Sequence, residues 1–242
     1  MTTFVLVHGG GHGGWCWQRV AGRLRAAGHD VHAPTLTGFG ERHHLVAESF
    51  DTFVTDVANV LEFEDLTGVV LVGHSMGGTI IPRVAEHVPE RIGSVVWVAA
   101  VVTDDGESLL DAVPQTEWTA RAVTLLPDGT AQTDHAAMLD AILQDGTPED
   151  RAWVLERHRD YPKHALVEPG RLRAFLALGL PTGYVAAADD RTIPVALART
   201  FADRLGASHR DEIPGGHDVM VTRPDELAAA LVRAAQATGR IT

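Results

Sequence analysis

The amino-acid sequence predicts an α/β fold in which helices cover both faces of a mainly parallel sheet of about six strands. Short continuous apolar runs recur along the chain, as expected for strands that are buried on both faces. Stretches with helical periodicity separate these runs, and this alternation is typical of a parallel sheet. The length of 242 residues suits one large domain that carries an insertion.

Six apolar runs are the strand candidates. Four are continuous and strongly apolar, and they cover residues 4–7, 69–72, 95–99 and 184–186. Two weaker runs, at residues 31–33 and 210–213, complete the expected sheet.

Three covering helices are indicated by their end signals. A helix over residues 15–27 would end at Gly28, which suits a left-handed C-cap. Ser49 can cap a second helix with an apolar stripe at i, i+3, i+4 and i+7 spacing; the stripe consists of Phe50, Phe53, Val54, Val57 and Leu61. Pro224 suits the first turn of a last helix.

An insertion follows the fourth main strand. The strand rhythm stops, and two amphipathic helices are expected, over about residues 134–143 and from near Pro148 to about residue 159. We therefore expect a core of residues 1–103 and 170–242 with a helical lid at residues 104–169. Such a lid would lie over the carboxyl end of the sheet, where open α/β sheets bind ligands.

Composition and charge restrict the function. Apolar residues make up 45% and charged residues 21%, as in a soluble globular enzyme. The formal charge of −12 disfavours nucleic acid as a partner, and no apolar run approaches the roughly 20 residues that span a bilayer. A single cysteine, Cys16, and an apolar strand without a preceding leader predict a cytoplasmic location. A homodimer is a candidate assembly.

The sequence GHSMG at residues 73–77 fits the G-x-S-x-G pattern of a nucleophile elbow. It directly follows the apolar run at residues 69–72 and precedes a helical stretch, which is the context the motif requires. The tight turn would present the Ser75 hydroxyl at the start of a helix, whose free N–H groups favour negative charge. Ser75 is therefore the expected nucleophile.

A serine nucleophile needs a base, and the base needs an acid that orients it. His217 lies between the last expected strand and the last helix, which is where this chain order places the histidine. Asp190 is the expected acid because it follows the run at residues 184–186, with Asp189 as the alternative. Asp104 and Asp105 are a second alternative and read more simply as solvated loop acids.

The first strand runs into HGGGHGG at residues 8–14, where backbone without side chains can aim an N–H at an oxyanion. We expect the N–H groups of Gly10 and Met76 to form a two-donor oxyanion hole.

Two other functions of this loop, dinucleotide binding and metal binding, do not fit the surrounding sequence. Its glycines also fit G-x-G-x-x-G, but no acidic residue ends the second strand to hold a ribose. His8 and His12 are four residues apart on a loop, so their spacing does not place them on one helix face as metal ligands. We expect neither a cofactor nor a metal.

Together, four segments resemble the plant methylesterase and hydroxynitrile lyase family and its bacterial relatives, which have the α/β-hydrolase fold. They are HGGGHGGWCW at residues 8–17, LTGFG at 36–40, GHSMGG at 73–78, and Asp190 ahead of Ile193 and Pro194. The resemblance implies a cofactor-free hydrolase with the triad Ser75, Asp190 and His217. It favours Asp190 over Asp189 and is weak across the expected lid.

The expected reaction is the hydrolysis of a carboxylic ester of a small, largely apolar molecule through an acyl-enzyme at Ser75. The expected substrate-binding residues are Gly9, Trp118, Trp153 and Tyr161. The alternatives are a lyase or C–C bond-processing enzyme of specialised metabolism, and a hydrolase-like small-molecule receptor.

Two residues separate the esterase from the lyase. As the resemblance implies, lyases carry a threonine at the position of Gly9 and a lysine at that of Asp218. A carboxylate facing the pocket would oppose an anionic leaving group, so ester hydrolysis is favoured over cyanohydrin cleavage.

Overall fold

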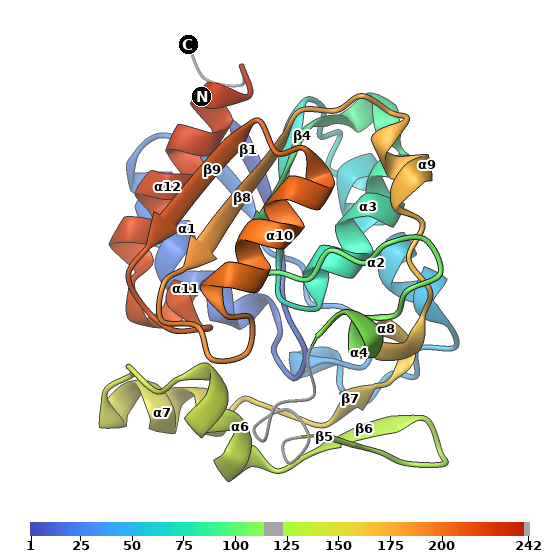
Figure 1. Ribbon diagram of the computed structural model, residues 1–242, viewed down its shortest axis with the longest axis vertical. Helices are drawn as coiled ribbons and strands as arrows, with labels where there is room; N and C mark the ends of the chain where they lie inside the picture. The colour runs from blue at the N-terminus through green and yellow to red at the C-terminus, as the bar shows by residue number, and fades with distance from the viewer. Residues whose placement is uncertain (114–122, 240–242) are drawn as a thin grey trace.

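The computed structural model describes residues 1–113 and 123–239. Its centre is a six-stranded, wholly parallel sheet in the order β2-β1-β3-β4-β8-β9 (Figure 1). The strands are β1 (Thr3–Val7), β2 (Asp30–His32), β3 (Val69–His74), β4 (Ile92–Val98), β8 (Thr182–Ala187) and β9 (His209–Ile213). All six expected runs form strands, and the predicted fold class is confirmed.

The strands are continuously apolar because both faces of the sheet are buried. In β1, Val5 and Val7 belong to one hydrophobic cluster, whereas Phe4 and Leu6 belong to the cluster on the other face. The first face is covered by α2 (Phe50–Phe63), α3 (Gly77–His87) and α10 (Val195–Leu205). The second is covered by α1 (Gln18–Ala26) and α12 (Pro224–Ala237), as Figure 1 shows.

The helix end signals are correct, with two differences. Gly28 has φ +84° just beyond α1, and Pro224 occupies the first turn of α12. The start of the first expected helix is instead a short 3-10 helix, η1 (Gly14–Trp17). Ser49 occupies the N-cap of α2, but its side chain makes no capping hydrogen bond. That helix is stabilised instead by burial of its apolar stripe.

The segment between β4 and β8 contains the two expected helices, α6 (His135–Ile142) and α7 (Pro148–Leu155). The segment also contains a small antiparallel sheet that the sequence analysis did not predict, formed by β5 (Val123–Leu125), β6 (Thr130–Thr133) and β7 (Tyr161–Pro162). These strands are two to four residues long and partly exposed, too short to show an alternating apolar pattern. The remaining short helices are α4 (Leu109–Ala112), α8 (His164–Val167), α9 (Leu172–Leu176), α11 (Val219–Thr222), η2 (Gly40–Arg42) and η3 (Pro89–Arg91).

In Figure 1 this insertion lies beyond the carboxyl ends of the central strands. Two backbone hydrogen bonds tie it to the core: Arg159 donates to the Gly11 carbonyl (3.1 Å), and Asp218 donates to the Ile142 carbonyl (2.9 Å). Both bonds lie at the end of the sheet where the motif residues gather. Within residues 1–113 and 123–239, every helix is too short or too polar to cross a bilayer.

Candidate active site

Ser75 lies in a strained turn between β3 and α3. Its φ is +51°, a left-handed conformation that is costly for a residue with a side chain. The flanking glycines are required because a Cβ at Gly73 would lie 2.7 Å from the Gly77 carbonyl oxygen. A Cβ at Gly77 would in turn lie 2.8 Å from the Val7 carbonyl oxygen. This is the strand–turn–helix context that the GHSMG motif predicts.

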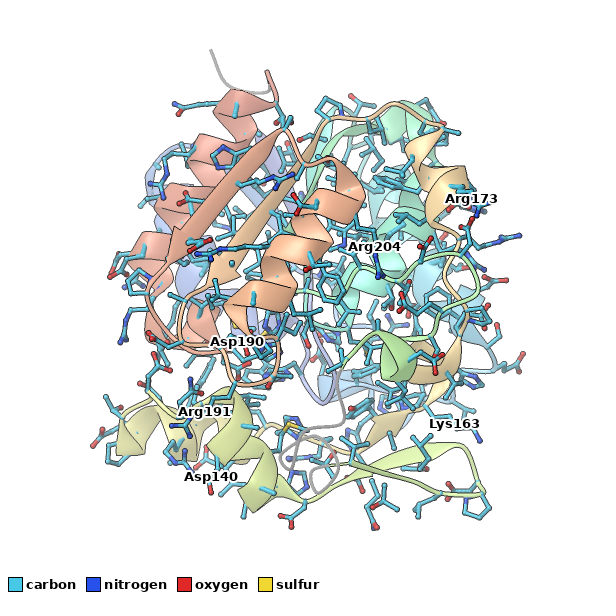
Figure 2. The ribbon with its side chains drawn as sticks, in the orientation of Figure 1. Asp140, Lys163, Arg173, Asp190, Arg191 and Arg204 are labelled. Atoms are coloured by element: carbon cyan, nitrogen blue, oxygen red, sulfur yellow. The ribbon has the colours of Figure 1, made fainter. Side chains whose placement is uncertain are left out.

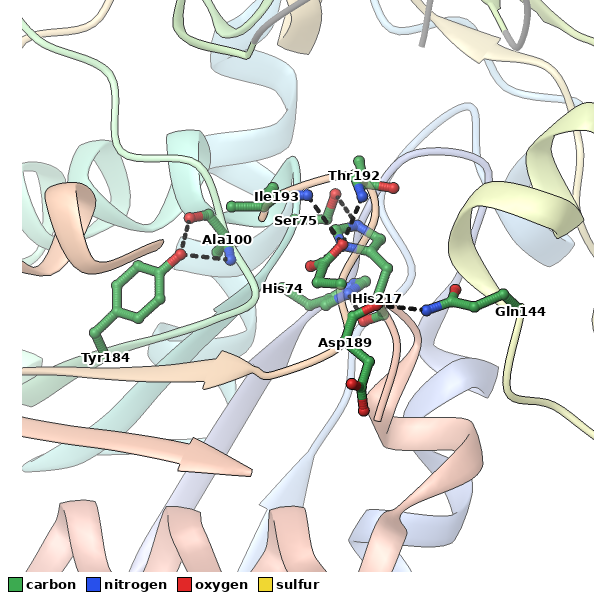
Figure 3. A network of polar contacts seen from close by, with 10 residues as sticks. His74, Ser75, Ala100, Gln144, Tyr184, Asp189, Thr192, Ile193 and His217 are labelled. Atoms are coloured by element: carbon green, nitrogen blue, oxygen red, sulfur yellow. Dashed lines mark hydrogen bonds and ion pairs between the residues drawn. The ribbon is translucent and has the colours of Figure 1, made fainter. Parts of the chain in front are cut away.

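The serine, the histidine and one aspartate form a hydrogen-bonded chain (Figure 3). His217 Nε2 is 2.9 Å from Ser75 Oγ, and His217 Nδ1 is 2.7 Å from Asp190 Oδ2. The other oxygen of Asp190 accepts hydrogen bonds from the backbone N–H groups of Thr192 and Ile193, at 2.7 and 2.9 Å. Those two bonds fix the carboxylate, so it can fix the histidine ring.

Asp189, the alternative acid, points elsewhere. Its side chain is exposed and accepts a hydrogen bond from the Gly215 N–H (3.2 Å), whereas Asp190 is buried. Figure 2 places Asp190 at the end of the core that faces the insertion. Asp104 and Asp105 lie on an exposed loop, where Asp105 pairs with Arg173 at 2.8 Å. The structure therefore brings only Asp190 of the four candidate acids to His217.

The environment of His217 favours its protonated form. Burial disfavours the charged ring, but the Asp190 carboxylate attracts the proton and accepts the Nδ1–H hydrogen bond, so the pKa of His217 is raised. His74 takes a different role. Its Nε2–H donates to the His217 carbonyl (3.0 Å), and burial lowers its pKa well below the ordinary value, so it supports the base as a neutral ring.

Two backbone donors lie beside the serine without protein acceptors. Among the described residues, neither the Gly10 N–H nor the Met76 N–H donates a hydrogen bond to the protein. Both residues line the same cavity as Ser75 and His217, and Met76 is the N-cap of α3. N–H groups at a helix start, free and next to a nucleophile, can bind a developing oxyanion.

The cavity at Ser75 has a volume of about 280 Å³ and is mostly apolar. The insertion supplies much of its wall, through Leu109, Leu110, Val123, Leu125, Met138, Ala141, Ile142, Tyr161 and Leu166. Few polar groups reach it, and a mostly apolar site with a few convergent polar groups is typical of small-molecule binding.

Of the four expected substrate-binding residues, Tyr161 alone is placed at the cavity by the structure. Trp153 is a correction: it packs against Trp15 with ring centroids 5.0 Å apart and stacks with Arg19 and Arg157, outside the cavity. Gly9 lies beneath the nucleophile, since a Cβ there would be 2.9 Å from Ser75 Cβ. Trp118 lies outside the described residues.

The sequence analysis missed a second buried histidine–carboxylate pair. His12 Nε2 lies 3.0 Å from Asp218 Oδ2, and Asp218 is fully buried. The sequence left open whether Asp218 faces the pocket or points away from it; its carboxylate turns toward His12 and is absent from the cavity wall. The two residues are 206 positions apart, so no local pattern could have revealed their contact.

The fold and the site define a class of protein. A parallel sheet with a strained serine between strand and helix, hydrogen-bonded to a histidine–carboxylate pair, is the arrangement of serine α/β-hydrolases. A family profile described as "Alpha/beta hydrolase family" matches residues 4–230. The chain belongs to this family.

Individual relatives agree with that assignment. The carbendazim hydrolyzing esterase of Nocardioides sp. (strain SG-4G) is 36% identical over 246 residues, which cover 96% of this chain and 98% of the relative. Salicylic acid-binding protein 2 of Nicotiana tabacum is 28% identical and covers 96% of each chain. A solved extracellular alpha/beta-hydrolase from a Paenibacillus species has a TM-score of 0.82 at 25% identity, over 97% of this chain and 99% of that one. The resemblance to plant and bacterial esterases is confirmed.

Proposed function

We propose that this protein hydrolyses carboxylic esters of small, largely apolar molecules through an acyl-enzyme at Ser75. The observation that carries the proposal is the chain of hydrogen bonds from Ser75 through His217 to Asp190 at the wall of an apolar cavity. The names of two relatives, a carbendazim hydrolyzing esterase and a pyrethroid hydrolase, support the same reaction class.

In the first half of the reaction, Ser75 Oγ attacks the ester carbonyl carbon while His217 Nε2 takes the hydroxyl proton. The carbonyl oxygen becomes an oxyanion, to which the Gly10 and Met76 N–H groups donate. His217 then gives its proton to the leaving alkoxide, and an acyl-enzyme remains. Water repeats the sequence with His217 as base, which releases the acid and restores Ser75.

The insertion acts in this proposal as a lid that shapes the acyl and alcohol subsites. It contributes Tyr161, which lines the cavity and whose hydroxyl would be 2.9 Å from a Cβ built at Gly10. In the described ranges this hydroxyl has no hydrogen-bond partner, and burial together with Asp160 raises its pKa, so it stays protonated. A free donor in an apolar cavity is suited to a polar atom of the substrate.

Tyr161→Phe is therefore expected to lower kcat/KM by about 2- to 13-fold, the equivalent of one neutral hydrogen bond of about 0.5–1.5 kcal/mol. The loss should appear for aryl esters that carry a second hydrogen-bond acceptor and vanish for matched esters without one. Steady-state kinetics on both ester series, with thermal unfolding as the control for folding, would measure it. Equal losses on the two series would contradict a substrate contact.

Activity should rise with pH through one ionisation, because His217 must be neutral to accept the serine proton. Since the pKa of His217 is raised, activity is lost as the pH falls through that value, and the midpoint should lie above about 6.5. Asp190→Asn should move the midpoint to lower pH. A kcat/KM profile from about pH 5 to pH 9 would test this, and a flat profile would argue against a histidine base.

A panel of aryl and alkyl esters, scored with Ser75→Ala as the blank, tests the proposed function. Mandelonitrile belongs in the panel because a lyase is the rival on the same fold. Gly9 offers no hydroxyl, and Asp218 is held by His12 away from the cavity, so no residue matches the lyase pattern at either position. Cyanide release that depends on Ser75 and equals the best ester rate would overturn the proposal. Failure of a serine-reactive probe to acylate Ser75 would favour a receptor.

We further propose a cytoplasmic location and a homodimeric assembly, with an ester as the small-molecule partner and neither membrane nor nucleic acid involved. The formal charge of −12 supports the exclusion of nucleic acid, and the buried, free Cys16 supports the cytoplasmic location. Light scattering would measure the assembly. Ester activity in the medium of producing cells would contradict the location, and one structural relative is described as extracellular.

A further inference from the structure

Both ring nitrogens of His12 contact acceptors. Nδ1 lies 2.7 Å from the Gly10 carbonyl oxygen, and Nε2 lies 3.0 Å from Asp218 Oδ2. A neutral imidazole has one N–H, so it can donate only one of these hydrogen bonds. Two donations therefore require the imidazolium form of His12.

The burial of this pair supports the charged form. The side chains of His12 and Asp218 are 3% and 0% exposed, and an unpaired charge at this depth would be costly. Burial alone would lower the pKa of His12, but the Asp218 carboxylate and the hydrogen bond to the Gly10 carbonyl together outweigh it, and the pKa is raised. Burial would likewise raise the pKa of Asp218, and the His12 cation holds it below its ordinary value. The two ions stabilise each other as a neutral pair.

Of the histidines around His12, two have lowered pKa values and the third has a carboxylate partner of its own. His74 and His158 lie 6.1 and 5.3 Å from the His12 ring, and burial lowers the pKa of His158 to about 3 and that of His74 well below its ordinary value. His217, whose pKa is raised, has its own carboxylate partner in Asp190. The carboxylate nearest to His12 is Asp218, which directly follows that base in the chain.

The acceptor of the Nδ1–H bond belongs to the oxyanion loop. Residues 9, 10 and 11 are all glycines, and such a run has wide backbone freedom unless other groups fix it. Three ties are present: His8 donates to the Gly9 carbonyl, His12 donates to the Gly10 carbonyl, and the Arg159 N–H donates to the Gly11 carbonyl. Hydrogen bonds from a charged donor are shorter and about twice as strong as neutral ones.

We propose that His12, held as an imidazolium by Asp218, is a positioning residue that fixes the Gly10 carbonyl and thereby orients the loop whose N–H binds the oxyanion. This inference rests on the proposed ester hydrolysis. Because Asp218 adjoins His217, one backbone segment presents the base and also secures the oxyanion loop. The His12–Asp218 contact thus links the segment of the base directly to the oxyanion loop.

Two variants separate the hydrogen bond that His12 donates to Gly10 from the positive charge on His12. In His12→Gln the side-chain amide nitrogen takes the place of Nε2 and still donates to Asp218, but the donor to Gly10 is lost. We expect kcat to fall about 10²-fold, as for loss of an oxyanion donor, with KM changed less than about threefold. In Asp218→Asn a neutral His12 keeps both contacts, since the amide donates to Nε2 and Nδ1–H still donates to Gly10. We expect a smaller loss of about tenfold.

Inhibitor binding distinguishes a loss of positioning of the oxyanion loop from general disruption of the active site. Affinity for a trifluoromethyl ketone, which forms an oxyanion adduct with Ser75, should fall in parallel with kcat/KM across the variants, while affinity for the product acid stays constant. His158→Gln is the matched control. That ring also packs on Gly11 but makes no hydrogen bond among the described residues, so kcat should stay within about threefold.

Nitrogen-15 spectra of histidine-labelled protein test the charge without any substrate. The parent should show two ring N–H signals for His12 at neutral pH, and Asp218→Asn should show one. A single N–H in the parent, or folded His12→Gln with kcat within about threefold of the parent, would overturn the inference alone. If His12→Gln does not fold, the kinetics and spectrum of Asp218→Asn and the nitrogen-15 spectrum of the parent decide whether the inference holds. If the parent turns over no ester, the proposed function itself fails.

Discussion

Ser75→Ala is expected to abolish ester turnover while the protein folds normally, with kcat reduced by about 10⁵-fold or more. The hydroxyl is the group that attacks, and its hydrogen bond to His217 Nε2 is lost with it. The turn itself depends on the crowding around Gly73 and Gly77, which alanine at position 75 leaves unchanged. Turnover of an activated aryl ester, with circular dichroism and thermal unfolding alongside, measures both halves of the expectation.

Ser208→Ala is a suitable control for this variant. This variant also removes one serine hydroxyl, which donates to the Thr182 carbonyl (2.9 Å). Ser208, however, lies between α10 and β9, away from the cavity. Activity should remain within about twofold of the parent. His217→Ala should lower kcat as much as Ser75→Ala does. The double variant should lower kcat no further, because the two residues act as a unit. Ser75→Ala turnover within about tenfold of the parent would refute the assignment of the nucleophile.

Asp190→Asn should reduce kcat by about 10⁴-fold without unfolding the protein. The asparagine oxygen can still accept from the Thr192 and Ile193 N–H groups, so the loop is retained. Its amide nitrogen, however, would face His217 Nδ1 as a donor. The ring would then carry its proton on Nε2, next to the serine, where it cannot act as a base. Single-turnover acylation rates would detect this loss directly.

Asp189→Asn provides the matched comparison, because it makes the same change one residue earlier. Its exposed carboxylate bonds the Gly215 N–H and does not reach His217, so kcat should stay within about threefold. If Asp189→Asn is the inactive variant and Asp190→Asn is active, the acid has been assigned to the wrong residue.

The features that the sequence predicted correctly are those that depend on local physics. A strand buried on both faces must be continuously apolar, so all six strands are visible as runs. The elbow at Ser75 needs glycines at fixed offsets because the backbone there leaves no space for a Cβ. The order of strand, loop and helix then leads to His217, whose Nε2 lies 2.9 Å from Ser75 Oγ. Each of these inferences uses residues that are close together in the chain.

A local sequence pattern predicts less reliably which of two adjacent residues has a given role. Asp189 and Asp190 have the same side-chain chemistry. The position after the end of the strand and the spacing seen in the resembled family both favoured Asp190. The direction of each side chain is fixed by its backbone partners, which are the Gly215 N–H for Asp189 and the Thr192 and Ile193 N–H groups for Asp190. The sequence narrowed the choice, and the geometry shows which carboxylate meets the histidine.

By itself, the sequence determined the α/β-hydrolase fold and the strand–turn–helix position of Ser75. The tertiary structure alone decided that Trp153 packs on Trp15 outside the cavity, that Tyr161 enters it, and that Asp218 turns to His12. The physical reason is distance along the chain. Periodicity and turn chemistry act over a few residues, whereas the His12–Asp218 contact joins loops 206 positions apart that meet only because parallel strands place their carboxyl ends at one edge of the sheet.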